Sequence, residues 1–124
     1  MAGRWIRFGQ SKLAILIYAR SLAKHYPQIT SVAVHPGIIA TGLLENLSFW
    51  DKVMVYGTNI GKIKEPREGI VNQIWAAVGD KKDIVNGGYY EPVGVVGRQD
   101  QESSREALEK ELWEWTQNEL NNWA

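Results

Sequence analysis

A chain of 124 residues has the length of one domain, and we treat residues 1–124 as a single domain. Lysine plus arginine and aspartate plus glutamate both number 14, so the formal net charge is zero and no basic field is present to hold a nucleic acid. Because the chain has no cysteine, disulfides, thiolate metal ligands and cysteine nucleophiles are excluded.

Two further features of the sequence concern the cellular compartment of the protein. No apolar run approaches about 18 residues, so the sequence predicts no membrane span. The first residues, MAGRWIRFGQSK, lack the apolar core of a signal peptide. We therefore expect a cytoplasmic protein with neither a membrane nor a nucleic acid as its partner.

The first predicted element is a long helix over residues 8–25, which ends before Pro27 because proline does not continue a helix. Every residue of the run Leu13–Ala19 is apolar or aromatic, which predicts that this helix is the most buried one, covered on more than one side. A strand is expected over Thr30–His35, and Pro36-Gly37 ends it.

Two further helices are predicted in the middle of the chain. A short one runs from about Ser48 to Tyr56, with Ser48 as its N-cap and Asp51 expected at the surface. Pro66 opens the next one at its first turn, and Gly79 ends it. The residues that share the apolar face of this helix are Ile70, Val71, Ile74, Trp75 and Val78.

The last part of the chain predicts a strand and a helix. Gly87–Tyr90 is expected to pair in parallel with the first strand. The final helix is predicted to begin near Ser103, where Ser103 and Glu106 have the spacing of a capping box. Its apolar stripe is formed by Leu108, Leu112, Trp115 and Trp123, widened by Trp113 and Leu120.

Several motifs follow one another in an order typical of one family. The first helix carries Phe8-Gly9-Gln10-Ser11-Lys12, and the first strand ends in Pro36-Gly37 with Thr41 close behind. Glu65-Pro66 and Gly87-Gly88-Tyr89-Tyr90 come later. In order and spacing these motifs resemble the second half of a short-chain dehydrogenase/reductase, over nearly the whole chain. The resemblance implies an α/β fold, a truncated Rossmann-like domain with a minimal parallel sheet and about four helices.

Two departures from the family decide the expected chemistry. Phe8 stands where the family has its catalytic tyrosine, and phenylalanine has no proton to exchange during hydride transfer. The sequence also lacks the family's N-terminal, dinucleotide-binding half with its glycine-rich loop. We expect no cofactor and no redox reaction by this chain alone, and two histidines in unrelated contexts predict no metal site.

The candidate site lies where the first strand ends, because open α/β sheets bind ligands there. We take Lys12, His35 and Tyr56 as candidate catalytic residues. Lys12 is either a cation for an anionic or carbonyl ligand or an inherited, solvated side chain. His35 is either a proton shuttle or part of a structural corner. The candidate ligand-binding residues are Phe8, Thr41, Leu44, Phe49 and Trp50.

Three functions are consistent with these features. The first is a non-redox enzyme of cyclase or isomerase type, acting on a small apolar metabolite under a lid formed by residues 43–60. The second is a binding or structural subunit, and the third is an inactive remnant of an NAD(P)-dependent oxidoreductase. We also expect a homodimer, because Leu13–Ala19 needs more cover than one chain offers and the tryptophans of the final helix provide a second contact surface.

Overall fold

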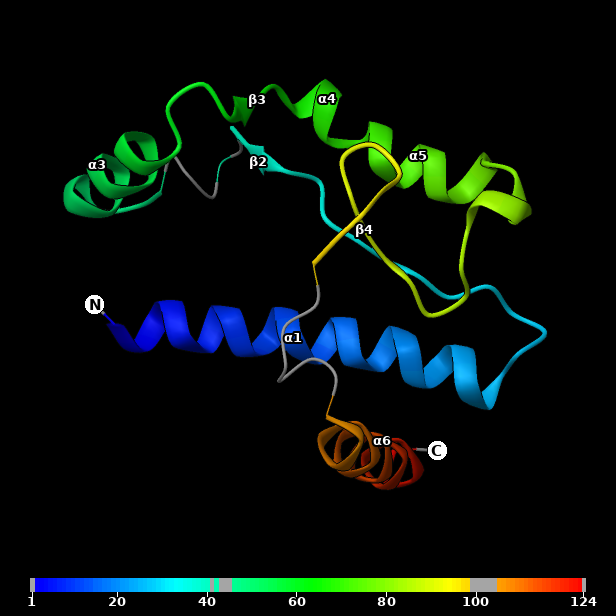
Figure 1. Cartoon of the computed structure of the whole chain (residues 1–124). Helices are drawn as coiled ribbons and strands as arrows, with labels where there is room; N and C mark the ends of the chain where they lie inside the picture. The colour runs from blue at the N-terminus through cyan, green and yellow to red at the C-terminus, as the bar shows by residue number, and fades with distance from the viewer. Residues whose placement is uncertain (1, 41, 43–45, 99–104, 124) are drawn as a thin grey trace. The chain divides into compact units, whose positions relative to one another are not determined.

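The computed structural model describes residues 2–40, 42, 46–98 and 105–123 (Figure 1). Its helices and strands confirm the predicted α/β class, and the helices of eight or more residues in this part of the chain are α1, α3, α5 and α6. The elements in chain order are α1 (Ala2–His25), β1 (Ala33–Val34), β2 (Ile38–Ile39), α3 (Phe49–Thr58), β3 (Ile63–Lys64), α4 (Pro66–Gly69), α5 (Val71–Val78), a 3-10 turn (Lys81–Asp83), β4 (Tyr89–Glu91), β5 (Val95–Val96) and α6 (Glu106–Asn121).

The chain divides into two compact units, which are described one at a time. The first unit comprises Met1–Ala33, Lys81–Tyr89 and Val96–Ala124, and the second comprises Val34–Asp80 and Tyr90–Val95. The division falls within β1, β4 and β5, three strands that pair in the order β1-β4-β5.

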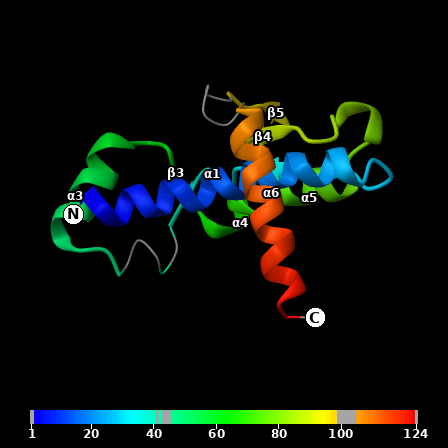
Figure 2. The same ribbon diagram turned by 90° about the horizontal axis from the view of Figure 1, so that it is seen from below.

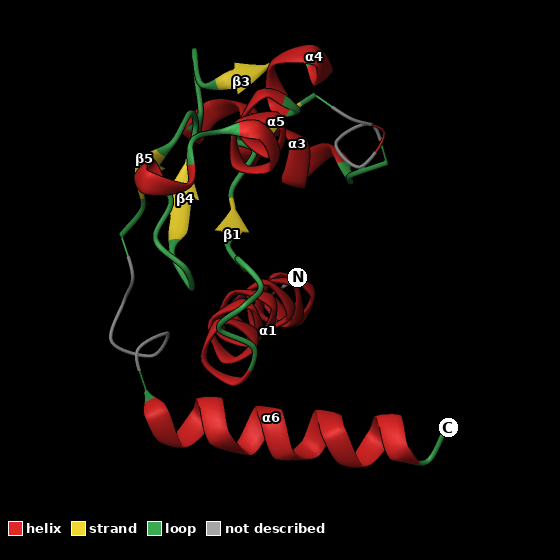
Figure 3. Ribbon diagram, turned by 90° about the vertical axis from the view of Figure 1, so that its right-hand side faces the viewer, coloured by secondary structure: helices red, strands yellow, loops and turns green. Residues whose placement is uncertain are grey.

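The first unit is built on the packing of α6 against α1, and α6 runs across α1 (Figures 2 and 3). Ile17 and Ser21 of α1 are fully buried, and Ile17 is the buried apolar residue among those described in this unit. Trp113 of α6 stacks on the ring of His25 with a centroid distance of 3.9 Å and on Tyr18 at 5.6 Å. Stacked aromatic contacts of this kind stabilise the packing of α6 on α1.

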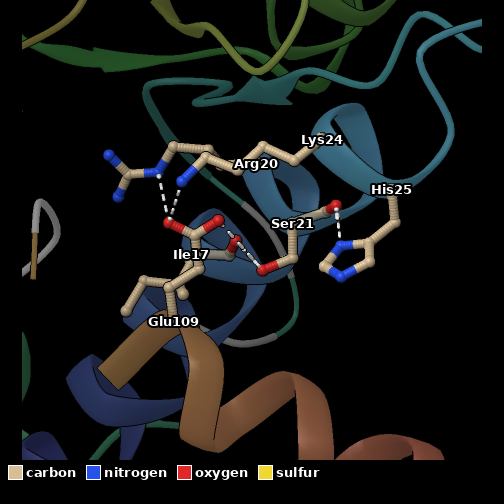
Figure 4. A network of polar contacts seen from close by, with 6 residues as sticks. All are labelled: Ile17, Arg20, Ser21, Lys24, His25 and Glu109. Atoms are coloured by element: carbon tan, nitrogen blue, oxygen red, sulfur yellow. Dashed lines mark hydrogen bonds and ion pairs between the residues drawn. The ribbon is translucent and has the colours of Figure 1, made fainter. Parts of the chain in front are cut away.

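A buried carboxylate links the two helices (Figure 4). Glu109 of α6 accepts a hydrogen bond from the Ser21 hydroxyl at 3.4 Å and from Lys24 Nζ at 2.9 Å. The Nε of Arg20 lies 3.7 Å from the same carboxylate. Burying the Glu109 charge costs free energy that these donors offset, so the network selects one register of α6 on α1.

The predicted burial of Leu13–Ala19 on more than one side is confirmed except at one residue, because every other member of the run is buried or half-buried. Ile17 is buried, but Ile15 on another side of α1 is 58% exposed. The predicted stripe of the last helix is also wrong in part, because Trp115 and Trp123 are 60% and 87% exposed. The side of α6 that meets α1 carries Trp113, a predicted member of the stripe, together with Glu109, which was not predicted there.

Two predicted helix starts differ from the structure. α1 ends at His25 as predicted but begins at Ala2 rather than Phe8, because no residue before Phe8 interrupts a helix. α6 begins at Glu106 with Arg105 as its N-cap, so the predicted start at Ser103 is wrong. Ser103 itself lies outside the described residues.

The strand expected over Thr30–His35 is shorter than predicted, since β1 covers only Ala33–Val34. The Ala33 N–H donates to Gly88 O at 2.9 Å and the His35 N–H to Tyr90 O at 2.8 Å, a pattern that ascends on both segments as in a parallel pair. Before β1, the side chain of Asn86 replaces a backbone partner. It accepts from the Ser31 N–H at 2.7 Å and donates to Ile29 O at 3.1 Å.

The second unit contains a parallel pair, β2 and β3, in which Ile38 pairs with Ile63 and Ile39 with Lys64 (Figure 1). Gly69 at the end of α4 packs directly on Ile39, and a Cβ at this glycine would lie 2.7 Å from that side chain. The local signals of this unit are confirmed, although the single helix expected between Pro66 and Gly79 is divided at Ile70 into α4 and α5. Ser48 caps α3, Pro66 occupies the first turn of α4, and Gly79 follows the last residue of α5.

The predicted apolar face of α5 is confirmed at one residue, Trp75, which is half-buried. The residues that stay exposed are Ile70, Val71, Ile74 and Val78. Asn72, on the same helix, is 1% exposed. Among the described residues of the unit, Tyr90 is the buried apolar one, and its ring contacts Trp75 at 4.9 Å. The helix is therefore fixed by a polar side chain beside a pair of aromatic rings.

No helix in the part of the chain that the structure describes is long and apolar enough to cross a membrane.

The Glu109 network predicts a measurable loss of stability in a Glu109→Ala variant. Removing the carboxylate leaves buried donors without their acceptor, which costs about 1–3 kcal/mol of unfolding free energy. Urea unfolding followed by circular dichroism measures it. The matched control is Glu114→Ala, because Glu114 is exposed and its ion pair with the exposed Lys110 spans 3.8 Å. We expect a change within about 0.5 kcal/mol there, and equal losses in the two variants would contradict the role of Glu109.

Candidate functional site

His35 follows β1 at the corner that the sequence predicts, and its ring turns back on the chain. Its Nδ1 accepts the Gly37 N–H at 2.8 Å. A neutral imidazole that accepts at Nδ1 carries its proton on Nε2. Gly37 has a φ of 88°, a left-handed conformation that favours glycine. The corner residues His35 and Gly37 therefore hold each other, and Nε2 is the ring nitrogen left for chemistry.

The backbone around this corner is held by Asn72, a residue that the sequence interpretation did not single out. Its Nδ2 donates to His35 O at 2.9 Å and to Tyr90 O at 3.1 Å. Its Oδ1 accepts the Gly94 N–H at 3.0 Å. One amide thus joins the end of β1, β4 and the turn after β4. The sequence signal for it was a single amide inside the apolar run of a helix.

The turn after β4 fits closely over the same helix. Gly94 has a φ of 68°, and a Cβ placed on it would lie 2.6 Å from the Trp75 ring. Any side chain at this position would displace the indole, so the glycine is required by space as well as by backbone conformation. With Asn72 and Trp75, α5 contacts this turn through both a hydrogen bond and a ring.

The predicted lid region contains α3, whose apolar residues face outward. Phe49 and Trp50 are 71% and 68% exposed, and their rings meet edge to face at 5.5 Å. Tyr56 on the same helix is also exposed. The expectation that Asp51 lies at the surface is wrong, because Asp51 is only 6% exposed and accepts the Ser48 hydroxyl at 2.7 Å. α3 therefore turns its acid inward and its aromatic rings outward.

Phe8 and Lys12 lie in α1, in the first unit. The Lys12 Nζ lies 5.2 Å from the centre of the Phe8 ring, within the range of a cation–π contact. Both side chains are exposed, and Trp5 meets Phe8 edge to face at 6.3 Å. The i, i+4 neighbourhood implied by the resemblance is present, with a phenyl ring in place of a phenol.

The predicted site residues are thus brought together only in part. Phe8 lies next to Lys12, and Phe49 next to Trp50. His35 and Tyr56 belong to the second unit, and Thr41 and Leu44 lie outside the described residues. A combined site of all these residues stays a prediction. Within the described residues no group of three His, Cys, Asp or Glu side chains could hold a metal ion.

Comparison with known proteins finds relatives of one kind. Over 96% of its length the chain is 30% identical to a short-chain dehydrogenase/reductase, drtF, of Aspergillus calidoustus, and it covers 41% of that protein. It is 29% identical to an uncharacterized oxidoreductase of Schizosaccharomyces pombe and 30% identical to a short-chain dehydrogenase/reductase of Armillaria gallica, covering 35% and 34% of them. The chain therefore spans about two-fifths or less of the length of these relatives. No family model and no solved structure matches it.

The Asn72 contacts predict that Asn72→Asp destabilises the fold. A carboxylate has no N–H for the two carbonyls that Nδ2 now serves, and it places negative charge against them. We expect a loss of about 2–4 kcal/mol in the unfolding free energy, measured by urea titration.

The matched control is Asn118→Asp, since Asn118 is exposed on α6. This change should shift the unfolding free energy by no more than about 0.5 kcal/mol. If Asn72→Asp unfolds at the same urea concentration as the unchanged chain, Asn72 does not hold the corner.

Proposed function

We propose that this chain, a partial homologue of the short-chain dehydrogenases/reductases, supplies the substrate side of such a fold and binds a small apolar molecule through α3. The observation that carries the proposal is the outward-facing apolar side of α3, with Phe49 and Trp50 each about two-thirds or more exposed. In the resembled family this part of the chain is the variable lid over the substrate.

The free energy available at α3 supports binding of an apolar ligand rather than a polar one. Fully burying a large apolar side chain contributes about 1.5–3 kcal/mol, and Phe49 and Trp50 present two such rings side by side. The described groups close to them on α3 offer mainly apolar surface, because Asp51 is already engaged by Ser48. The binding free energy of a ligand that covers this face comes chiefly from removing apolar surface from water.

The chemistry we propose for the bound molecule is non-redox, of cyclase or isomerase type. Phe8 cannot give or take the proton that a tyrosine would exchange, and its ring is occupied by Lys12. His35 has Nε2 available for a proton shift, since its Nδ1 is held by the Gly37 N–H. Reactions that depend on holding an apolar molecule in one shape need few further groups.

The alternative that the chain is a binding or structural subunit, or an inactive remnant of an NAD(P)-dependent oxidoreductase, agrees with the same family relationship. It differs in one consequence. A scaffold or remnant has no reason to bind an apolar molecule at α3 with defined stoichiometry, so a binding experiment separates it from the proposal.

The proposal predicts saturable binding of N-phenyl-1-naphthylamine, a neutral apolar fluorophore, at one site per chain. The double variant Phe49→Ser/Trp50→Ser should weaken binding by about tenfold or more, because two exposed rings that a ligand would cover are removed. Fluorescence titration of the probe measures the dissociation constant.

The matched control for this titration is Trp115→Ser, which removes a tryptophan of similar exposure from α6. Its affinity should equal that of the unchanged chain. Non-saturable binding, or an equal loss in both variants, would refute a ligand site at α3 and favour the scaffold or remnant.

A further inference from the structure

We propose that α3, with the lysines at and after it, is a docking surface for a lipid bilayer that carries anionic headgroups. The surface consists of Phe49, Trp50, Val53, Met54 and Tyr56, flanked by Lys52, Lys62 and Lys64. It is called the α3 face below. Docking goes beyond the binding of a small apolar molecule and does not require it, although a molecule dissolved in the lipid would meet α3 at the same place.

The apolar residues of the α3 face share one side of the helix. Relative to Phe49 they occupy positions i, i+1, i+4, i+5 and i+7, which fall on one broad stripe of a helix with 3.6 residues per turn. All five side chains are exposed. Figure 1 shows α3 at one end of the second unit, with β2 and β3 between it and α4.

The opposite side of α3 explains why this orientation is stable. Asp51 points inward, where Ser48 donates to its carboxylate at 2.7 Å and accepts the Asp51 N–H at 3.3 Å. A helix that buried its apolar side would instead turn Asp51 to water and Phe49 and Trp50 to the core. α3 does the reverse, which is the arrangement of an amphipathic helix whose apolar side meets a non-aqueous phase.

The charges of residues 46–64 indicate which kind of partner could cover the α3 face. Between residues 46 and 64 the charged residues are Asp51, Lys52, Lys62 and Lys64. The one acid is buried, whereas Lys62 and Lys64 are exposed. The Lys62 N–H donates to Asn59 O at 3.0 Å, so Lys62 closes a tight turn that begins at Asn59, the C-cap of α3. The accessible charge of residues 46–64 is therefore positive, and the acids that follow, Glu65 and Glu68, are engaged in the capping box of α4.

A lipid surface fits this face better than a second copy of the chain. The exposed parts of the five side chains amount to an apolar patch on the order of 500 Å², so two copies would bury about 1,000 Å² in all, below the usual size of a stable interface. Two copies would also bring their lysines together, which is unfavourable. Anionic headgroups attract lysines instead, and each lysine near the surface raises the membrane partition coefficient by about fivefold. Aromatic rings and lysines of this kind favour the boundary between headgroups and acyl chains.

The short apolar runs of the sequence do not oppose this inference. They exclude a helix that crosses the bilayer, and the described helices agree with that. A helix that lies in the interface needs one apolar side and no such length. Peripheral docking therefore departs from the expectation of no membrane partner, which rested on the absence of a spanning segment in the sequence.

The test is flotation of the full chain with vesicles of phosphatidylcholine and phosphatidylserine in a ratio of about 7 to 3. We expect the chain to float with these vesicles, to bind far less to pure phosphatidylcholine, and to be released as salt rises from about 0.1 to 1 M. Phe49→Ser/Trp50→Ser should lower the partition coefficient by about tenfold or more. Lys62→Gln should lower it by about fivefold.

Trp115→Ser is the control, because it removes an exposed tryptophan outside the α3 face and should partition like the unchanged chain. Circular dichroism checks that each variant folds. If the double variant fails to fold, Lys62→Gln still tests the proposal. The proposal is overturned if the chain does not float with anionic vesicles, or if Phe49→Ser/Trp50→Ser floats equally well.

A dimer in light scattering that Phe49→Ser/Trp50→Ser dissociates, together with no vesicle binding, would assign the face to a second copy and overturn docking. Binding of N-phenyl-1-naphthylamine without flotation overturns docking and leaves the ligand site standing. Flotation without probe binding supports docking and refutes the ligand site.

Discussion

The second unit depends on one side-chain amide. Asn72 satisfies three backbone groups, which belong to His35, Tyr90 and Gly94. Each of these groups would cost about 1–3 kcal/mol if buried without a partner, which is comparable to what burying a whole apolar side chain contributes. Because Tyr90 is the buried apolar residue described in this unit, hydrogen bonding rather than apolar volume defines the conformation of the corner at His35.

The first unit is also held by a buried polar side chain, in this case a carboxylate. Glu109 binds Ser21 and Lys24 across the contact of α6 with α1, next to Ile17. A buried polar group contributes directional contacts that an equally small apolar core would lack, so these hydrogen bonds orient the elements of each unit even though few apolar side chains are fully buried. The apolar side chains that do not enter these centres remain at the surface and are available for binding.

The sequence predicts the local boundaries of this fold better than its buried faces. Helix ends depend on backbone conformation or on a neighbouring N–H, as at Ser48, Pro66 and Gly79. A few consecutive residues therefore determine where a helix begins or ends. Which side of a helix is buried depends on what packs against it. Periodicity finds the apolar side of α5 but gives no information on whether a neighbour covers it.

The candidate site shows the same difference between local and tertiary information. The proximity of Phe8 and Lys12 follows from helical spacing and is present in the structure. Asn72 was missed because a single amide in an apolar run looks like an interruption of the stripe. Its three partners lie 37, 18 and 22 residues away along the chain, so no local pattern identifies them.

The orientation of α3 links stability to binding. Ser48 and Asp51 bond to each other within the first turn, and these bonds do not involve the rings of Phe49 and Trp50. A ligand or lipid that covers the rings therefore leaves the internal contacts of the helix intact. Whatever binds there adds its binding free energy to the folded state without an opposing loss inside α3. An exposed aromatic face on an internally satisfied helix can thus persist in water and still favour an apolar partner.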